Sequence, residues 1–215
     1  MRALRAVRGL RPDLVWHEDS SLVRYDAVVL PGGFSFGDYL RGGAIAARSP
    51  ALSRVATLAD RGAPVLGICN GFQILIEAGL LPGALLRNST LRFICRWVAV
   101  RVENERTPFT RGLKKGQVVR MPIAHNEGRY VAPARELTML GSNGGVVFRY
   151  CDARGRPTAA SNPTGTSANI AGICNKNGNV VGLMPHPERA ADRILSPFNS
   201  EDGAFIFRSL QEGSN

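Results

Sequence analysis

Residues 67–71, Gly-Ile-Cys-Asn-Gly, have the types and spacing for nucleophilic chemistry. An apolar run before them predicts a buried strand, and apolar residues after Asn70 predict a helix that ends at Gly79. Strand, turn and helix match the nucleophile elbow G-x-S-x-G, with cysteine in place of serine. So sharp a turn needs glycine on both sides, and amides at the helix start favour a thiolate over a thiol. Cys69 is therefore predicted to be a catalytic nucleophile, the alternative being a buried structural cysteine between two chance glycines.

A cysteine nucleophile needs a base, and the sequence holds three histidines. His17 lies in a polar segment and is most simply a surface residue. His125 follows an expected strand in a polar loop, where it could merely cap local backbone. His186 follows an apolar strand and has a proline on each side, which predicts a stiff, extended backbone. Residues two apart in such a backbone point the same way, so we predict Glu188 beside His186, completing a triad with Cys69.

The elements around these residues predict an α/β fold. We expect strands at residues 14–16, 27–30, 65–68, 93–102, 118–124, 146–150 and within 171–184, and helices at 1–11, 49–61, 70–79 and 203–210. Three strand–loop–helix units in a row indicate a mostly parallel sheet flanked by helices. The alternating valines of 98–102 and a hairpin signal at Asn177-Gly178 predict an appended antiparallel or mixed region. With no repeat or linker, residues 1–215 are expected to form a single domain.

Composition narrows the possible functions. The formal net charge of +10 raises the possibility of nucleic-acid binding. However, the arginines are spread along the chain, and the four at its start recur every third residue like one solvated helix face. The four cysteines are scattered, which predicts neither a zinc site nor a disulfide framework and favours a reducing cytoplasm. No signal peptide, apolar membrane span or ATP-binding motif is recognisable.

The elbow together with Pro-His-Pro-Glu at 185–188 resembles the class I, triad-type glutamine amidotransferases. More specifically, four segments resemble the glutaminase subunits of phosphoribosylformylglycinamidine synthase. They are the glycine-rich loop at 31–43 and the segments 92–97, 123–130 and 162–173. The resemblance covers essentially the whole chain and implies a flavodoxin-like three-layer fold.

The resemblance implies that Cys69 attacks the side-chain amide of glutamine and forms a thioester. Backbone amides at Gly33 and Asn70 would stabilise the oxyanion. Further candidates are Phe34, Gln73 and Arg92 for substrate binding and His125 and Arg129 for the partner or channel. The ammonia would pass to a synthase subunit that uses ATP and Mg²⁺ to make formylglycinamidine ribonucleotide in purine biosynthesis, with or without a small third subunit. No cofactor or metal is expected in this chain.

One departure from the family concerns the N-terminus. The family begins with a strand and a Pro-Gly-Ser-Asn-Cys-type loop, whereas Met1 here falls within the following helix, so we expect the first strand to be missing. Three alternatives remain open at this point. They are another cysteine-elbow α/β hydrolase or amidotransferase, a basic nucleic-acid-binding domain, and a subunit without catalytic activity.

Overall fold

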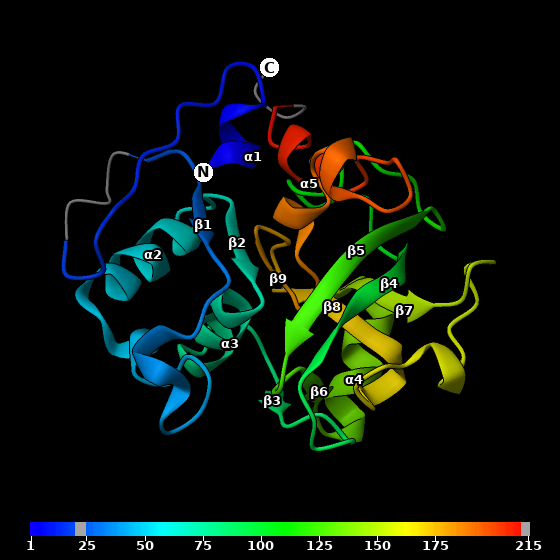
Figure 1. The fold of residues 1–215 in the computed structure, drawn as a ribbon. Helices are drawn as coiled ribbons and strands as arrows, with labels where there is room; N and C mark the ends of the chain where they lie inside the picture. The colour runs from blue at the N-terminus through cyan, green and yellow to red at the C-terminus, as the bar shows by residue number, and fades with distance from the viewer. Residues whose placement is uncertain (20–24, 212–215) are drawn as a thin grey trace.

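The computed structural model describes residues 1–19 and 25–211, which fold around one seven-stranded sheet (Figure 1). The strand order is β1-β2-β9-β8-β7-β4-β5. The bounds are β1 Val28–Leu30, β2 Val65–Ile68, β4 Ile94–Val102, β5 Val118–His125, β7 Val146–Cys151, β8 Ile170–Cys174 and β9 Val180–Leu183. A separate antiparallel pair is formed by β3 (Ala84–Leu86) and β6 (Arg129–Val131).

The strands β1, β2 and β9 are parallel, and they form the end of the sheet that carries the elbow. All residues of β2 and β9 are buried, as expected of parallel strands covered on both faces. The turn between β8 and β9 contains Gly178 at a φ of 75°, which glycine adopts without strain. From β9 onward the pairing is antiparallel through β8, β7, β4 and β5. The predicted α/β class and its antiparallel extension are confirmed, and both parts share one sheet.

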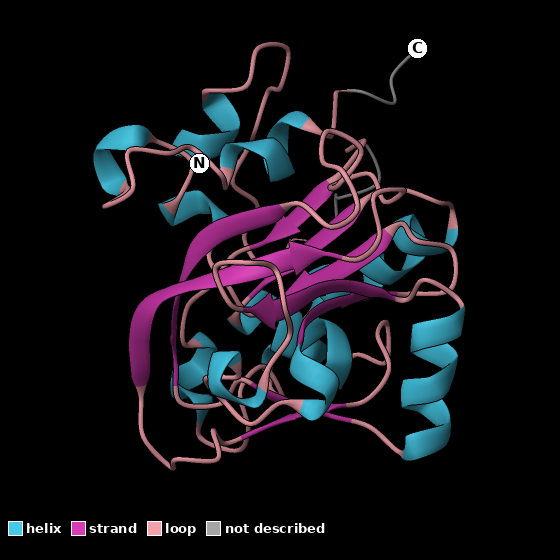
Figure 2. Cartoon of the chain, turned by 90° about the vertical axis from the view of Figure 1, so that its right-hand side faces the viewer, coloured by secondary structure: helices cyan, strands magenta, loops and turns pink. Residues whose placement is uncertain are grey.

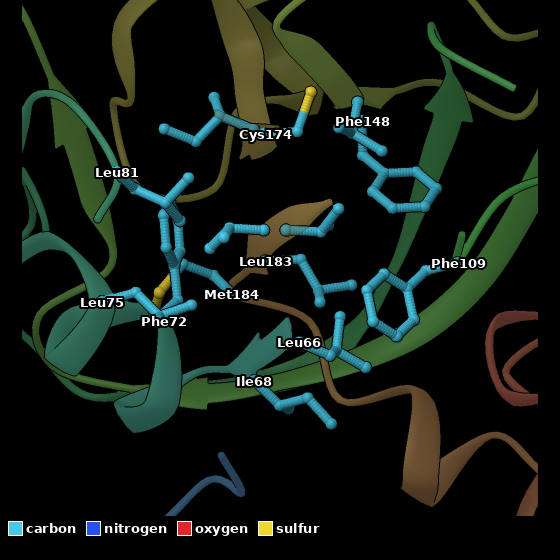
Figure 3. Packing of buried hydrophobic residues seen from close by; sticks show 14 of the residues in the cluster. Leu66, Ile68, Phe72, Leu75, Leu81, Phe109, Phe148, Cys174, Leu183 and Met184 are labelled. Atoms are coloured by element: carbon cyan, nitrogen blue, oxygen red, sulfur yellow. The ribbon is translucent and has the colours of Figure 1, made fainter. Parts of the chain in front are cut away.

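Helices lie on either side of the strands (Figure 2). Their bounds are α1 Arg2–Arg5, α2 Pro50–Asp60, α3 Asn70–Glu77, α4 Ala134–Ser142 and α5 Ala204–Arg208. The apolar face of α3 packs on the sheet, where Phe72 and Leu75 meet Leu66 and Leu183 in the core (Figure 3). No helix within the described ranges is long and apolar enough to cross a membrane.

Two expectations for the first 16 residues are wrong. The predicted helix over 1–11 is helical only at Arg2–Arg5, and Gly9, at a φ of 87°, turns the chain away from a helical path. Residues 14–16 form no strand, and Leu14 and Trp16 remain 82% and 68% exposed. An apolar triplet becomes a strand only where another strand pairs with it. Sequence patterns also missed α4, β3 and β6, which are short or lie among polar residues.

Candidate functional site

Cys69 occupies a strained turn between β2 and α3. Its φ of 51° and ψ of −104° are unusual for a residue with a side chain. Its backbone amide donates to the carbonyl of Leu183 on β9 at 2.8 Å, so the neighbouring parallel strand holds the turn in place. Strain of this kind persists only where the surrounding fold enforces it, and it concentrates at functional sites.

The glycines beside Cys69 are required by close backbone approaches. A β-carbon on Gly67 would lie 2.6 Å from the carbonyl oxygen of Gly71, nearer than real contacts allow. A β-carbon on Gly71 would overlap the carbonyl oxygen of Leu30 at the end of β1. Gly67 therefore lets the turn close on itself, and Gly71 lets it approach β1, as the sequence pattern predicts.

His186 and Glu188 form a close pair. Nδ1 of His186 lies 2.6 Å from Oε1 of Glu188, and the imidazole is buried while the carboxylate is partly exposed. Their proximity is correctly predicted, but the predicted reason is wrong. Residues Pro187–Arg189 form a 3₁₀ turn, not an extended segment, and this turn folds Glu188 back against the ring. The other ring nitrogen, Nε2, is buried and has no hydrogen-bond partner among the described residues.

The free edge of β5 holds the cysteine and histidine segments together. The amide of His186 donates to the carbonyl of Pro122 at 2.8 Å, and the thiol of Cys69 donates to the carbonyl of Ala124 at 3.9 Å. The distance from thiol to carbonyl is long, which is typical of a weak sulfur donor. Because β5 is at the opposite end of the sheet order from β1, the sheet must curl to bring this edge to the elbow.

Gly32 lies directly against the triad. A β-carbon at this position would be 2.7 Å from Cε1 of His186 and 3.5 Å from Cβ of Cys69. Sequence analysis singled out its neighbour Gly33, whose own β-carbon would meet nothing within 4 Å. The two consecutive glycines after β1 indicate a close approach of the backbone to another group. In the structure it is the first of them, Gly32, that approaches His186 and Cys69.

The thiol of Cys69 is protonated in the free subunit. Burial raises its pKa to about 12, and the charges of Glu188 and Asp38 act in the same direction. The backbone amide of Asn70 and the charge of Arg189 lower the pKa, but they do not offset burial. The helix start thus favours the thiolate, as predicted, but burial outweighs this effect in the free subunit. A base must remove the proton as the sulfur attacks.

The remaining candidate residues are placed differently. Gln73 is buried, with its amide accepting from Asn70 Nδ2 at 2.8 Å and donating to the carbonyl of Glu127 at 2.8 Å. Phe34 is 64% exposed, and its ring centroid lies 6.4 Å from that of Phe93. Arg92 is exposed, and its guanidinium makes no hydrogen bond or ion pair with the described residues.

The sequence predicts a polar loop over 125–130; residues 126–128 do form a loop, but the two ends of the segment lie in strands. His125 is the last residue of β5 and is buried, as are Gly128 and Tyr130. Arg129 begins β6, and its Nε is buried without a partner among the described residues. The side chains of His125 and Tyr130 therefore belong to the interior of the protein.

A polar network beside the elbow was missed by sequence analysis. Nδ2 of Asn70 lies 3.3 Å from the carboxylate of Asp38, and its Oδ1 accepts from the amide of Ser35 at 3.1 Å. Glu127 accepts from the amide of Gly42 at 3.2 Å. Burial and the nearby charge of Glu127 raise the pKa of Asp38. In the sequence, this network is indicated only by polar residues that lie close to glycines.

Nothing in this arrangement resembles a metal centre. Among residues 1–19 and 25–211, no three His, Cys, Asp or Glu side chains gather as metal ligands would. The site instead combines an elbow thiol, an imidazole held by a carboxylate, and backbone amides at a helix start. Those are the parts of an acyl-transfer site that uses a covalent cysteine intermediate.

Comparison with known proteins identifies the family. Residues 6–211 match the model of the CobB/CobQ-like glutamine amidotransferase domain. Phosphoribosylformylglycinamidine synthase subunit PurQ of Thermomicrobium roseum is 57% identical over 210 residues, which cover 98% of this chain and 88% of the relative. This chain belongs to the PurQ family. The PurQ subunit of Aquifex aeolicus is 56% identical, over 92% of this chain and 86% of its own.

A solved structure agrees with the PurQ assignment. The structure of PurLQS from Thermotoga maritima superposes with a TM-score of 0.83 at 45% identity, covering 98% of this chain and 89% of the other. The predicted family and the amidotransferase fold are thus confirmed. Membership of the PurQ family also decides against a basic nucleic-acid-binding domain, because the match covers nearly all of the chain that carries the positive charge.

Proposed function

We propose that Cys69, His186 and Glu188 are the catalytic triad with which this subunit hydrolyses glutamine. The chain is the glutamine amidotransferase subunit of phosphoribosylformylglycinamidine synthase, and it acts in purine biosynthesis. The observation that carries the triad is the buried imidazole of His186. A carboxylate holds one of its nitrogens at 2.6 Å, while a β-carbon on Gly32 would touch both this ring and the side chain of the elbow cysteine.

The first step joins sulfur to carbon. Nε2 of His186 takes the thiol proton as Sγ of Cys69 attacks the side-chain amide carbon of glutamine, and the carbonyl oxygen becomes an oxyanion. Because burial keeps the thiol protonated until substrate arrives, proton transfer and attack are coupled. Glu188 stabilises the imidazolium that forms and fixes the tautomer that presents Nε2 to the sulfur.

Backbone amides stabilise the oxyanion. The amide of Asn70 is at the first position of α3, where helix geometry leaves it without an intrahelical partner. It lowers the pKa of Cys69 and so favours negative charge at this position. The amide of Gly33, in the turn beside the triad, is the proposed second donor. Donors fixed by backbone need no reorganisation as the charge develops.

The tetrahedral intermediate then breaks its carbon–nitrogen bond. His186 returns the proton to the departing nitrogen, which leaves as ammonia, and a thioester between Cys69 and the glutamyl group remains. Water attacks the thioester carbon and gives its proton to His186. The carbon–sulfur bond breaks, and the imidazole returns the proton to the sulfur, releasing glutamate and the starting thiol.

The synthase subunit is the partner that receives the ammonia, and we propose that it alone binds ATP and Mg²⁺. The docking surface we propose is an aromatic patch on two loops beside the elbow, Phe34, Tyr39 and Phe93, which are 64%, 88% and 52% exposed. Large exposed aromatic side chains commonly anchor protein interfaces. We place the complex in the cytoplasm, where four unpaired cysteines remain reduced.

The test separates the two half-reactions. In the reconstituted complex, Cys69→Ala should abolish glutamine-driven synthesis but retain synthesis driven by a high concentration of ammonium salt. The matched control is Cys174→Ala, which also removes a buried sulfur but lies on β8 away from the triad. It should retain both activities within a few-fold.

His186→Ala extends the same comparison. It removes the proton carrier and keeps the nucleophile, so it should leave a residual glutaminase and normal ammonium-driven synthesis. The proposal is wrong if the Cys69→Ala complex assembles but loses both activities, or if it continues to release glutamate at the normal rate.

A further inference from the structure

A second buried imidazole lies beside the triad. His125 is 2% exposed, and neither of its ring nitrogens has a hydrogen-bond partner among the described residues. Buried polar groups are almost always paired, because the interior does not replace the hydrogen bonds of water. An imidazole with both nitrogens unpaired is therefore suited to a ligand that offers both a donor and an acceptor.

Its position ties His125 to the reacting atoms. The preceding residue, Ala124, accepts the hydrogen bond of the Cys69 thiol. On the same strand the carbonyl of Pro122 fixes the backbone of His186. The charge of His186 acts on His125, so the two imidazoles are close enough to interact. His125 is thus one residue along β5 from the carbonyl that accepts the thiol of the proposed nucleophile.

The surroundings of the ring are built around it. A β-carbon on Gly128 would overlap the imidazole, so glycine makes room for it. Asn88 is fully buried and donates from Nδ2 to the carbonyls of His125 and Arg92, both at 2.9 Å. Its Oδ1 accepts from the amide of Gly128 at 3.1 Å. One asparagine therefore fixes the backbone on both sides while the ring nitrogens remain available.

The charge state of the ring suits a neutral ligand. Burial, and then the nearby charge of His186, lower the pKa of His125 to about 4. Near neutral pH the ring is uncharged and offers one donor and one acceptor. Ammonia offers the complementary groups, and it must stay unprotonated because ammonium has no lone pair for attack. A neutral imidazole can bind ammonia without giving it a proton.

We infer that His125 receives the ammonia released at Cys69 and holds it, unprotonated, at the start of its path to the synthase subunit. This inference rests on the proposed function and adds a residue outside the triad. No bond forms or breaks at His125. Its role is to compete with loss of ammonia to solvent, so its removal changes the fate of the ammonia and not the chemistry that releases it.

The experiment compares His125→Leu, which keeps much of the volume without nitrogens, with His125→Gln, which restores a donor and an acceptor. In the reconstituted complex, glutamate and formylglycinamidine ribonucleotide are measured in the same sample, and free ammonia is measured in the solvent. For His125→Leu, the product formed per glutamate released should fall at least about 3-fold, with the missing ammonia in solution. His125→Gln should recover at least half of the lost ratio.

Two controls isolate the effect. Tyr130→Phe removes a different buried hydrogen bond, from the hydroxyl to the carbonyl of Pro82 at 3.1 Å, and should keep the wild-type ratio. Cys69→Ala tests the proposed function separately, because glutamate release from that variant would overturn the triad whatever the product ratio of the His125 variants. Size-exclusion chromatography measures how much of each variant has assembled with the synthase subunit, and ammonium-driven synthesis normalises for active synthase subunit.

Three results would overturn the inference. They are an unchanged ratio in assembled His125→Leu, a loss of glutamate release with the ratio unchanged, and accumulation of the glutamyl thioester on Cys69. The last would assign His125 to thioester hydrolysis. If His125→Leu fails to assemble, His125→Met, which also lacks a hydrogen-bond donor, takes its place, and an unchanged ratio in the assembled His125→Met complex would overturn the inference in the same way.

Discussion

Gly32→Ala should disable the glutaminase through a single methyl group. A β-carbon at residue 32 would lie 2.7 Å from Cε1 of His186, whereas an ordinary contact is 3.4 Å or longer. The imidazole must therefore retreat by about 0.7 Å, or the turn after β1 must move by the same amount. The ring of His186 is held by the contact of Nδ1 with Oε1 of Glu188 at 2.6 Å. Its backbone is held by the hydrogen bond from its N–H to the carbonyl of Pro122 at 2.8 Å. A shift would lengthen one of these bonds or move Nε2 away from the thiol.

The size of the effect follows from the geometry. A misplacement on the order of 1 Å costs about 100-fold in rate, equivalent to about 2.7 kcal/mol in the activation barrier. We expect kcat for glutamate release to fall about 30- to 100-fold, with a smaller change in KM. Overpacking should also lower the unfolding free energy by about 1–3 kcal/mol. Ammonium-driven synthesis by the reconstituted complex should be retained, because the mutation does not reach the partner's chemistry.

Gly33→Ala is the matched control for this prediction. Its β-carbon would meet nothing within 4 Å, and its backbone amide is retained, so glutamate release should fall by no more than a few-fold. Steady-state glutamate release by both variants, with urea unfolding in parallel, makes the comparison. Equal rates for Gly32→Ala and the wild type would refute the contact with His186. Equal losses in both variants would show that flexibility of the turn matters and not the overlap.

Two further predictions concern ionisable groups. Without substrate, iodoacetamide near neutral pH should label the exposed Cys95 first and Cys69 slowly, because Cys69 is buried and its pKa is raised to about 12. A chloroketone analogue of glutamine should instead label Cys69. Peptide mapping identifies the labelled residue, and early labelling of Cys69 by iodoacetamide would contradict the burial argument. Burial lowers the pKa of His125 from its ordinary value of 6.5 to about 4. Between these pH values the unfolded chain binds a proton at this residue and the folded chain does not. As pH falls through this range, the free energy of unfolding should therefore decrease by up to about 3 kcal/mol for this one group. Urea unfolding at pH 7 and pH 4.5 should show a smaller loss in His125→Gln than in the wild type, and identical losses would mean that His125 is accessible to protons in the folded state.

The sequence alone determined the parts of the protein whose physics is local. The elbow needs small residues on both sides of Cys69, and this requirement shows directly in the residue types. The parallel strands β2 and β9 are continuous apolar runs because both faces are covered. Asn177-Gly178 marks the hairpin between β8 and β9 because that turn needs a positive φ. Glu188 is close to His186 because only one residue separates them, even though the turn that joins them is not the predicted one.

Only the tertiary structure decided the properties that depend on distant segments. Gly32 matters because the curled sheet places the end of β1 against His186. The two residues are 154 positions apart in the sequence, and that separation does not predict their distance in space. The pKa of Cys69 depends on competition between a helix start, which a sequence reveals, and burial by β5 and the surrounding loops, which it does not. Burial wins, and the helix start does not yield a thiolate. His125 reads as a loop residue because its neighbours are polar. It becomes a buried neutral imidazole because β5 continues to the reaction site and Asn88 satisfies the backbone around it. Local propensity is encoded over a few residues, whereas desolvation and close approach arise only when the whole sheet has folded.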